Sequence, residues 1–197
     1  MKNCVVAMVT MALCLAATGF AQSRSVSDGG YFGFITAYPD PSNRVSWLWE
    51  PQGGGLVNVY VFFDSFLGDP VSAAAFRLVT GGGFTGVYIG ETVFGSVWLG
   101  DTQDGIAVQL GACYNAPRLL VTVQYMTDGT SPSCSWLEVA GHPDYDAVAM
   151  VDCNDNLHFQ VVSYKLVVIR SWADRKACGL VPVDKNTWGR IKALYKE

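Results

Sequence analysis

Charged residues are scarce in this chain of 197 residues: they make up 15% of it, with 13 lysines and arginines against 17 aspartates and glutamates. The formal net charge is −4. No basic surplus is available to attract a phosphate backbone, so we expect no nucleic-acid partner. Half of the residues are hydrophobic, which excludes a disordered chain and is enough for a packed core. The length fits one domain of ordinary size.

Long apolar runs are absent after the start of the chain. The first residues, MKNCVVAMVTMALCLAATGFAQS, hold one lysine, an uncharged apolar run from Val5 to about Ala17, and small residues at 19–21 that suit cleavage. The run is short for the ~20 residues of a membrane-spanning helix. We therefore predict a signal peptide over residues 1–21 and no transmembrane segment in the mature chain, which is secreted to the periplasm, the cell surface or the extracellular space.

Asn-x-Ser/Thr sequons are absent as well. Glycosylation therefore gives no support for a eukaryotic secreted protein, and a bacterial exported protein fits as well or better.

Closely spaced cysteines are also missing, which argues against a zinc site built from C-x2-C pairs. Cleavage of the signal removes Cys4 and Cys14 and leaves an even number of cysteines in an oxidising compartment, where two disulfides are the natural expectation. The four cysteines are Cys113, Cys134, Cys153 and Cys178.

The strand order suggests how these cysteines pair. If the strands from residue 106 onward run alternately up and down, Cys134 lies near Cys153 and Cys113 lies near Cys178. A bond between Cys113 and Cys134 would have to cross the length of a strand, which exceeds the reach of a disulfide. We therefore predict the pairs Cys134–Cys153 and Cys113–Cys178.

Short apolar segments rich in valine, tyrosine, phenylalanine and tryptophan fill the middle of the chain. Two of them, LVNVYVFF (56–63) and LLVTVQYM (119–126), alternate with a period of two, which is typical of strands. Breaks rich in glycine, aspartate, asparagine and proline separate the segments at intervals of about ten residues. The pattern predicts an all-β fold over residues 22–180: an antiparallel β-sandwich of the immunoglobulin-like or Greek-key type, with nine to eleven strands.

The end of the chain, residues 181–197, has a different pattern. After an exit segment with a proline, Asp184 is a suitable cap for a short amphipathic helix. One stripe of that helix carries Trp188, Ile191, Leu194 and Tyr195. Two interpretations stay open for these four residues: they dock on the domain, or they are recognised during export or anchoring.

A resemblance bears on this tail. NTWGRIKALYKE resembles the C-terminal ends of uncharacterised exported proteins of environmental bacteria, in which a Trp-Gly-x-Ile-Lys-x-Leu-Tyr tail follows β-rich domains. VNVYVFF, AAAFRLV and the spaced cysteines are similar to the small secreted β-sandwich domains of those proteins. The resemblance implies a secreted β-sandwich without established activity, and a tail that export or anchoring machinery recognises. It brings no catalytic residues.

One turn has the beginnings of a calcium loop. Asp152, Asn154 and Asn156 read D-x-N-x-N, and oxygen ligands at alternate positions suit a hard cation. However, Leu157 and Ser163 stand where a calcium loop needs a glycine and a bidentate glutamate. We keep these three residues as a weak calcium candidate, and we expect a tight turn with no bound metal and no cofactor.

Histidine occurs only twice, as His142 and His158. The two flank a predicted strand, at opposite ends of it, so we expect no shared zinc site. A histidine with Asp144 or Asp146 has the groups for acid and base chemistry. No G-x-S-x-G motif and no free cysteine of the mature chain supplies a nucleophile. We therefore expect no enzyme.

Tryptophan, in contrast, is plentiful. Trp47 and Trp49 lie two residues apart in VSWLWEP and so share one strand face, where flat rings can stack on sugars or fill the core. We predict a secreted, non-catalytic binding or structural module whose partner is an extracellular glycan or protein. The first alternative is a carbohydrate-binding module that uses Trp47 and Trp49, and the second is a secreted hydrolase that uses the region of His142 and His158.

Overall fold

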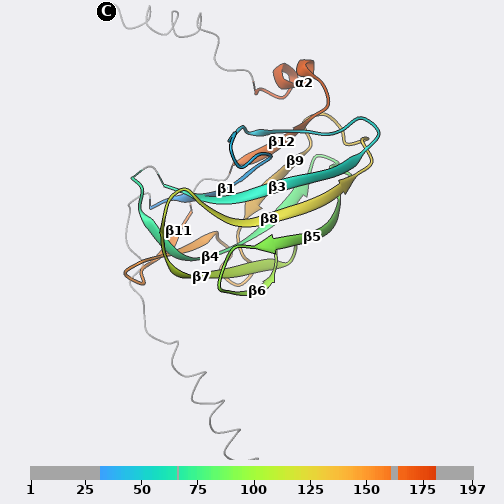
Figure 1. Ribbon diagram of the computed structural model, residues 1–197. Helices are drawn as coiled ribbons and strands as arrows, with labels where there is room; N and C mark the ends of the chain where they lie inside the picture. The colour runs from blue at the N-terminus through green and yellow to red at the C-terminus, as the bar shows by residue number, and fades with distance from the viewer. Residues whose placement is uncertain (1–31, 66, 161–163, 181–197) are drawn as a thin grey trace, which may run out of the picture.

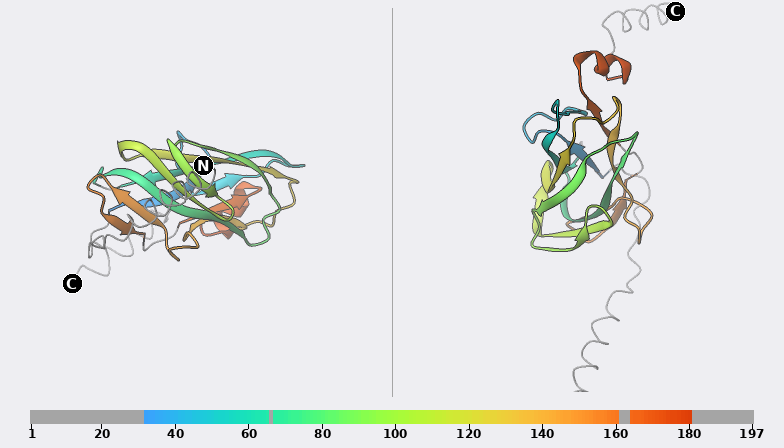
Figure 2. Two further views of the ribbon diagram at one scale, coloured as in Figure 1. Left: turned by 90° about the horizontal axis from the view of Figure 1, so that it is seen from below. Right: turned by 90° about the vertical axis from the view of Figure 1, so that its right-hand side faces the viewer.

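The computed structural model describes residues 32–65, 67–160 and 164–180. They form a sandwich of two β-sheets followed by one short helix (Figures 1 and 2), which confirms the all-β sandwich. The elements are β1 (Phe34–Tyr38), β2 (Trp47–Trp49), β3 (Gly55–Asp64), β4 (Pro70–Gly81), β5 (Val87–Val93), β6 (Val97–Asp101), β7 (Gly105–Asn115), β8 (Arg118–Thr127), β9 (Trp136–Ala140), β10 (Ala149–Asp152), β11 (Leu157–Phe159), β12 (Lys165–Ile169) and helix α2 (Trp172–Ala177).

The described chain has twelve strands, one more than the upper end of the predicted range. The sequence HFQVVSYKLVVIR (158–170) reads as one apolar segment but holds two strands, since β11 ends at Phe159 and β12 begins at Lys165. The sequence between them, QVVSY, continues the apolar pattern. Periodicity alone therefore does not reveal the break.

The two sheets differ in complexity. One contains four antiparallel strands in the order β1-β3-β8-β5. The other is built around β4, which pairs with β7, β9 and β10, and it continues from β9 through β12 to β2. The pairing of β2 with β12 is parallel. It joins segments that lie more than a hundred residues apart in the chain.

The core lies between the two sheets and is filled by alternate residues of the strands. On β3 the inward face carries Val57, Val59, Val61 and Phe63, all buried as the period of two predicts. Phe76 of β4 and Leu137 of β9 face them from the other sheet, and both have no exposed surface. Burying one such side chain contributes about 1.5–3 kcal/mol, so the alternation is what selects this fold.

The four cysteines of the described chain form two disulfides, as predicted, but with a different pairing. Cys113 bonds to Cys153, and Cys134 bonds to Cys178. The predicted pairs Cys134–Cys153 and Cys113–Cys178 are therefore wrong. The pair Cys113–Cys134, which the sequence analysis excluded, is not formed either.

The error comes from the turn after β9. An up-and-down order requires the chain to reverse direction at residues 141–146. Instead, β9 and β10 both run antiparallel to β4, with β9 opposite Arg77–Gly81 and β10 opposite Val71–Ala75. The two strands follow each other along β4, so Cys134 and Cys153 lie at opposite ends of it.

Each disulfide joins segments at one end of β4. The last residues of β7 pair with the first residues of β4, which places Cys113 beside Cys153. At the other end, β12 runs antiparallel to β9 and back toward Cys134, and α2 then brings Cys178 to it. The second disulfide therefore ties the helix to the sandwich.

Helix α2 begins at a capping box that the sequence analysis overlooked. The Ser171 hydroxyl accepts a hydrogen bond from the Asp174 N–H, and the Asp174 carboxylate accepts one from the Ser171 N–H. The predicted signal peptide and the predicted tail helix with Trp188, Ile191, Leu194 and Tyr195 lie outside the described residues. Within the described residues, no helix has the length and apolar content needed to cross a membrane.

Candidate functional site

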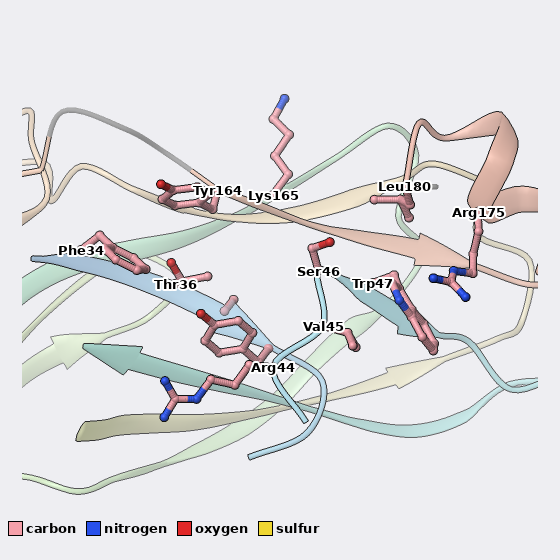
Figure 3. Close-up of a pocket in the computed structure, with 12 residues that line it drawn as sticks. Phe34, Thr36, Arg44, Val45, Ser46, Trp47, Tyr164, Lys165, Arg175 and Leu180 are labelled. Atoms are coloured by element: carbon pink, nitrogen blue, oxygen red, sulfur yellow. The ribbon is translucent and has the colours of Figure 1, made fainter. Parts of the chain in front are cut away.

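A groove of about 510 Å³ lies along β1 where this strand approaches β12 and the start of β2 (Figure 3). Among the strands that the structure describes, β1 pairs with β3 alone and forms an edge of its sheet, and the groove runs along its other side. Ligand sites typically measure ~300–1,000 Å³, and this groove falls within that range. Four aromatic rings line it, from Phe34, Tyr38, Trp47 and Tyr164, together with three cationic side chains, those of Arg44, Lys165 and Arg175.

The turn between β1 and β2 determines which residues reach the groove. The Asp40 carboxylate accepts hydrogen bonds from the N–H groups of Ser42 and Asn43, at 2.7 and 3.2 Å, as expected of an aspartate that stabilises a turn. The chain then passes Arg44 and enters β2 beside β12. The Pro-Asp-Pro-Ser-Asn break thus brings Arg44 and Trp47 alongside β1.

Trp47 lies at one end of the groove, against helix α2. Its ring centroid is 5.7 Å from that of Trp172, and the Arg175 guanidinium lies 5.0 Å from both ring centroids. Trp49 also packs against Trp172, with ring centroids 5.9 Å apart. Trp49 is 40% exposed and Trp172 is 63% exposed. The rings are tilted against each other by more than 50°, so this cluster is not one flat platform.

Arg44 is held by neighbours on β1 and β3. Its guanidinium forms an ion pair with the Asp64 carboxylate and lies 4.8 Å from the centroid of the Phe62 ring. The Tyr38 hydroxyl donates a hydrogen bond to the same carboxylate, at 3.1 Å. Burial, and then the charge of Asp64, raise the pKa of Tyr38 to about 12. Tyr38 therefore stays protonated and acts as a donor that fixes Asp64 and, through it, Arg44.

The other two cations are less tightly paired. Lys165 Nζ lies 3.7 Å from the Glu138 carboxylate and 4.1 Å from the centroid of the Trp136 ring. No carboxylate of the described residues lies within ion-pair distance of Arg175. Among the described residues that line the groove, none is acidic. Of the three cations in the lining, Arg175 is therefore the one without a carboxylate partner among the described residues.

The structure also leaves a row of apolar side chains exposed on the outer face of the four-stranded sheet. Leu56, Met126 and Val87 lie opposite one another on β3, β8 and β5, and between 46% and 65% of each is exposed. Ile89, also on β5, is 55% exposed. None of these four residues lines the groove along β1.

The two histidines serve different local contacts. The His142 ring accepts a hydrogen bond from the Asp144 N–H and lies 5.5 Å from the Tyr145 ring centroid. His158 stacks on Phe32 at 4.1 Å and lies 3.1 Å from the Asp152 carboxylate. In the described part of the chain no contact joins the two histidines, and no group of three His, Cys, Asp or Glu side chains is arranged to hold a metal ion.

The candidate calcium residues form a hydrogen-bonded turn. Asp152 Oδ1 accepts from the N–H groups of Asn154 and Asn156, and Oδ2 accepts from the Asn156 amide. Burial raises the pKa of Asp152, but the hydrogen bonds from Asn156, His158 and Asn154 outweigh it and lower that pKa to about 2. The carboxylate thus has its partners within its own turn, as an aspartate in a tight turn does.

Sequence reasoning found part of the groove. It singled out Trp47 and Trp49 as a pair on one strand face but did not select Trp172, Arg175 or Arg44. The signal for the helix was present, since Ser171-Trp-Ala-Asp174 has the S-x-x-D pattern of a capping box. No local sequence pattern predicted that Trp172 of this helix would pack against Trp47 and Trp49 of β2.

Comparisons with known proteins add little about function. No family model matches the chain, and no curated protein matches it. Among solved structures, a cohesin module from a family 33 glycoside hydrolase of Clostridium perfringens overlaps with a TM-score of 0.48 at 15% identity, over 71% of this chain and 98% of that one. The sixth cohesin of scaffoldin B from Acetivibrio cellulolyticus, solved in complex with a Cel5 dockerin, gives 0.48 at 12% identity, over 71% and 99%.

The human F-spondin reeler domain gives a TM-score of 0.35 at 12% identity, over 77% of this chain and 99% of that one. Scores below 0.5 carry no argument about what this chain binds. The candidate site therefore rests on the groove itself.

Proposed function

We propose that the protein is a secreted, non-catalytic binding module that takes an anionic ligand in the groove along β1. The observation that carries the proposal is the lining of that groove: four aromatic rings, no carboxylate among the described residues, and Arg175, which has no ion pair there. Aromatic rings supply contact area and guanidinium groups supply directional hydrogen bonds to oxyanions. The combination suits recognition better than bond cleavage.

Two further observations support this function. Disulfides persist in oxidising compartments, and the two bridges of this chain agree with export, so the signal peptide over residues 1–21 and the domain over 22–180 stand as proposals. The two histidines make separate local contacts, His142 with Asp144 and His158 with Asp152, which supports a binding role over the hydrolase alternative.

Binding of charged polymers tests the proposal. The protein is titrated with poly-L-glutamate, polygalacturonate and poly-L-lysine at low salt, and binding is followed by tryptophan fluorescence. The two polyanions are expected to bind and the polycation is not. Arg175→Gln is expected to weaken polyanion binding about tenfold, because a hydrogen bond to a charged group contributes about 1.5–3 kcal/mol.

Arg170→Gln is the matched control. Arg170 is exposed, lies just before α2 and does not line the groove, so its loss removes the same charge from the same region. If both variants bind polyanions equally well, or if poly-L-lysine binds as tightly as poly-L-glutamate, the groove is not an anion site and the proposal fails.

A carbohydrate-binding module is a second candidate, favoured by the exposure of Trp49 beside Trp172. Neutral glycans would then bind without regard to salt. An array of neutral and acidic glycans separates the cases: binding of neutral glycans that Trp49→Ala abolishes, and that Trp98→Ala on exposed β6 leaves intact, would establish the sugar site.

A further inference from the structure

We propose that the groove binds an acidic peptide in an extended conformation, whose backbone pairs with Ala37 of β1 and whose carboxylate meets Arg175. The inference rests on the proposed function, because it names the ligand class of that same groove. It assigns to β1 the role of a template strand.

The backbone of β1 presents the right groups to the groove. Along a strand of an antiparallel pair, N–H and C=O groups turn alternately toward the partner strand and away from it. Ile35 turns both groups away from β3, because its N–H donates to Gln160 Oε1 and its C=O accepts from Gln160 Nε2. Ala37, two residues on, turns its own N–H and C=O to the same side.

Ala37 contributes its backbone, rather than its side chain, to the groove. Its methyl group belongs to the core and the residue is only 2% exposed, yet Ala37 is part of the groove lining. The side-chain amide of Gln160 bonds to the N–H and C=O of Ile35 as the peptide group of a neighbouring strand would. A peptide amide opposite Ala37 would continue this row of hydrogen bonds along the edge of β1.

Two polar atoms of the lining indicate a missing partner. Thr36 is 7% exposed, and its Oγ1, which lies near the Tyr38 hydroxyl, makes no hydrogen bond of normal geometry among the described residues. Arg175 Nε is also buried without a partner there. Buried polar groups are nearly always hydrogen-bonded, and both residues line the groove. A peptide carries carbonyl and carboxylate oxygens that both atoms can use.

Charge identifies the kind of peptide. Arg175 lies at the α2 end of the groove, whereas the Lys165 side chain points away from β1 (Figure 3), toward Glu138 and Trp136. Arg175 is therefore the cation offered to a strand laid on β1. The chain's own tail, residues 181–197, has four basic residues and two acidic ones. It is therefore a poor electrostatic match, and a foreign acidic segment is the better occupant.

Selection from a displayed library of short random peptides tests the charge preference with the full mature chain. Peptides enriched in aspartate and glutamate are expected, and Arg175→Gln is expected to reduce their affinity about tenfold while Arg170→Gln leaves it unchanged. Enrichment of lysine and arginine, or no enrichment at all, would overturn the peptide proposal. Binding of polygalacturonate in the same preparation would still support an anion groove.

An N-methyl scan tests the strand pairing. One selected peptide is synthesised with each backbone amide methylated in turn, which removes one N–H donor at a time. Methylation at the residue opposite Ala37 is expected to weaken binding at least tenfold, and methylation at its two neighbours is expected to change it less than twofold. A flat scan would refute the added strand and leave anion binding by the groove untouched.

Ala37→Pro gives the reciprocal measurement on the protein. It removes the N–H that faces the groove and spares the hydrogen bonds of β1 to β3, as proline does on an edge strand. Peptide affinity is expected to fall at least tenfold, with Ala37→Gly, which keeps both backbone groups, close to wild type. The methyl scan decides the matter if the proline variant does not fold. Displacement of the acidic peptide by a synthetic 181–197 peptide would overturn the choice of occupant.

Discussion

The four-stranded sheet has two edges, and they are built differently. β1 pairs with β3 in unbroken register from Phe34 to Tyr38, and its outer side faces the groove. β5, at the opposite edge, has a register shift between Tyr88 and Gly90, which leaves Ile89 as an extra residue that is 55% exposed. The β1 edge is therefore regular and lies within the groove, whereas the β5 edge has a bulge and is exposed.

The difference shows which edge is free to accept a strand. A bulge twists an edge and interrupts the row of backbone groups that another strand would need, and natural proteins use bulges to prevent edge-to-edge association. β5 also turns Glu91 inward, where its carboxylate accepts from the Thr102 N–H and hydroxyl. The bulged edge is thus closed to pairing despite its apolar side chains, and the regular edge is limited to what fits the groove.

The largest effect is expected from the disulfide beside the groove. Replacing Cys134 and Cys178 by alanine should lower the free energy of unfolding by about 2–4 kcal/mol, because the unfolded chain regains the entropy of an open loop. It should also weaken binding of polyanions to the groove, since Cys178 ties α2, with Arg175, to the sandwich. Denaturant unfolding and the polymer titration measure the two effects.

The other disulfide is the natural control. Cys113 and Cys153 are 40 residues apart and Cys134 and Cys178 are 44 apart, so loop entropy predicts nearly equal losses of stability. The Cys113/Cys153 double alanine variant should keep its affinity for polyanions when folded. Equal loss of affinity in both variants would show that α2 does not control the groove.

The sequence predicted the core but not the groove, for a physical reason. Alternation on β3 and β8 reports which face of a strand is buried, and Val59 and Val123 are buried accordingly. The groove depends on pairings between distant segments: β2 joins β12 in parallel, and Cys134 holds the end of α2. Periodicity carries no information about such pairings. The disulfide pairs were predicted wrongly for the same reason. A chain that continues in one direction after a turn has the same residue pattern as a chain that reverses, so the pattern does not show which strands pair.

The second effect concerns the turn that leads the chain back toward β1. Asp152 holds the turn between β10 and β11, and Gln160, the residue after β11, hydrogen-bonds through its side chain to the backbone of Ile35. The pKa of Asp152 is lowered to about 2 in the folded protein, against ~3.9 in an unfolded chain. A carboxyl with a depressed pKa stabilises the fold above its unfolded pKa, and this contribution disappears as the pH falls from about 4 to about 2.

Asp152→Asn should therefore destabilise the protein at neutral pH by about 2 kcal/mol, and the difference from wild type should shrink steadily as the pH falls through that window. Asp155→Asn is the control: Asp155 is exposed, and its φ of 63° is one that asparagine also adopts, so its stability should follow wild type at every pH. Urea unfolding at a series of pH values gives the measurement. A constant difference between Asp152→Asn and wild type would contradict the assignment.

The smallest effect on stability, and the most direct test of the two edges, is expected at the bulge of β5. Deleting Ile89 removes the extra residue and restores a regular register against β8, so the edge of β5 should gain an unbroken row of backbone groups beside exposed Val87. Edges of this kind associate, and sedimentation velocity should show concentration-dependent self-association that wild type lacks.

Ile89→Lys keeps the bulge and adds a charge, so it should stay monomeric, within about 0.5 kcal/mol of wild type. Neither change touches β1, so both should bind polyanions as wild type does. If the deletion variant stays as monomeric as Ile89→Lys, the bulge is not what keeps β5 unpaired, and the contrast between the two edges loses its physical basis.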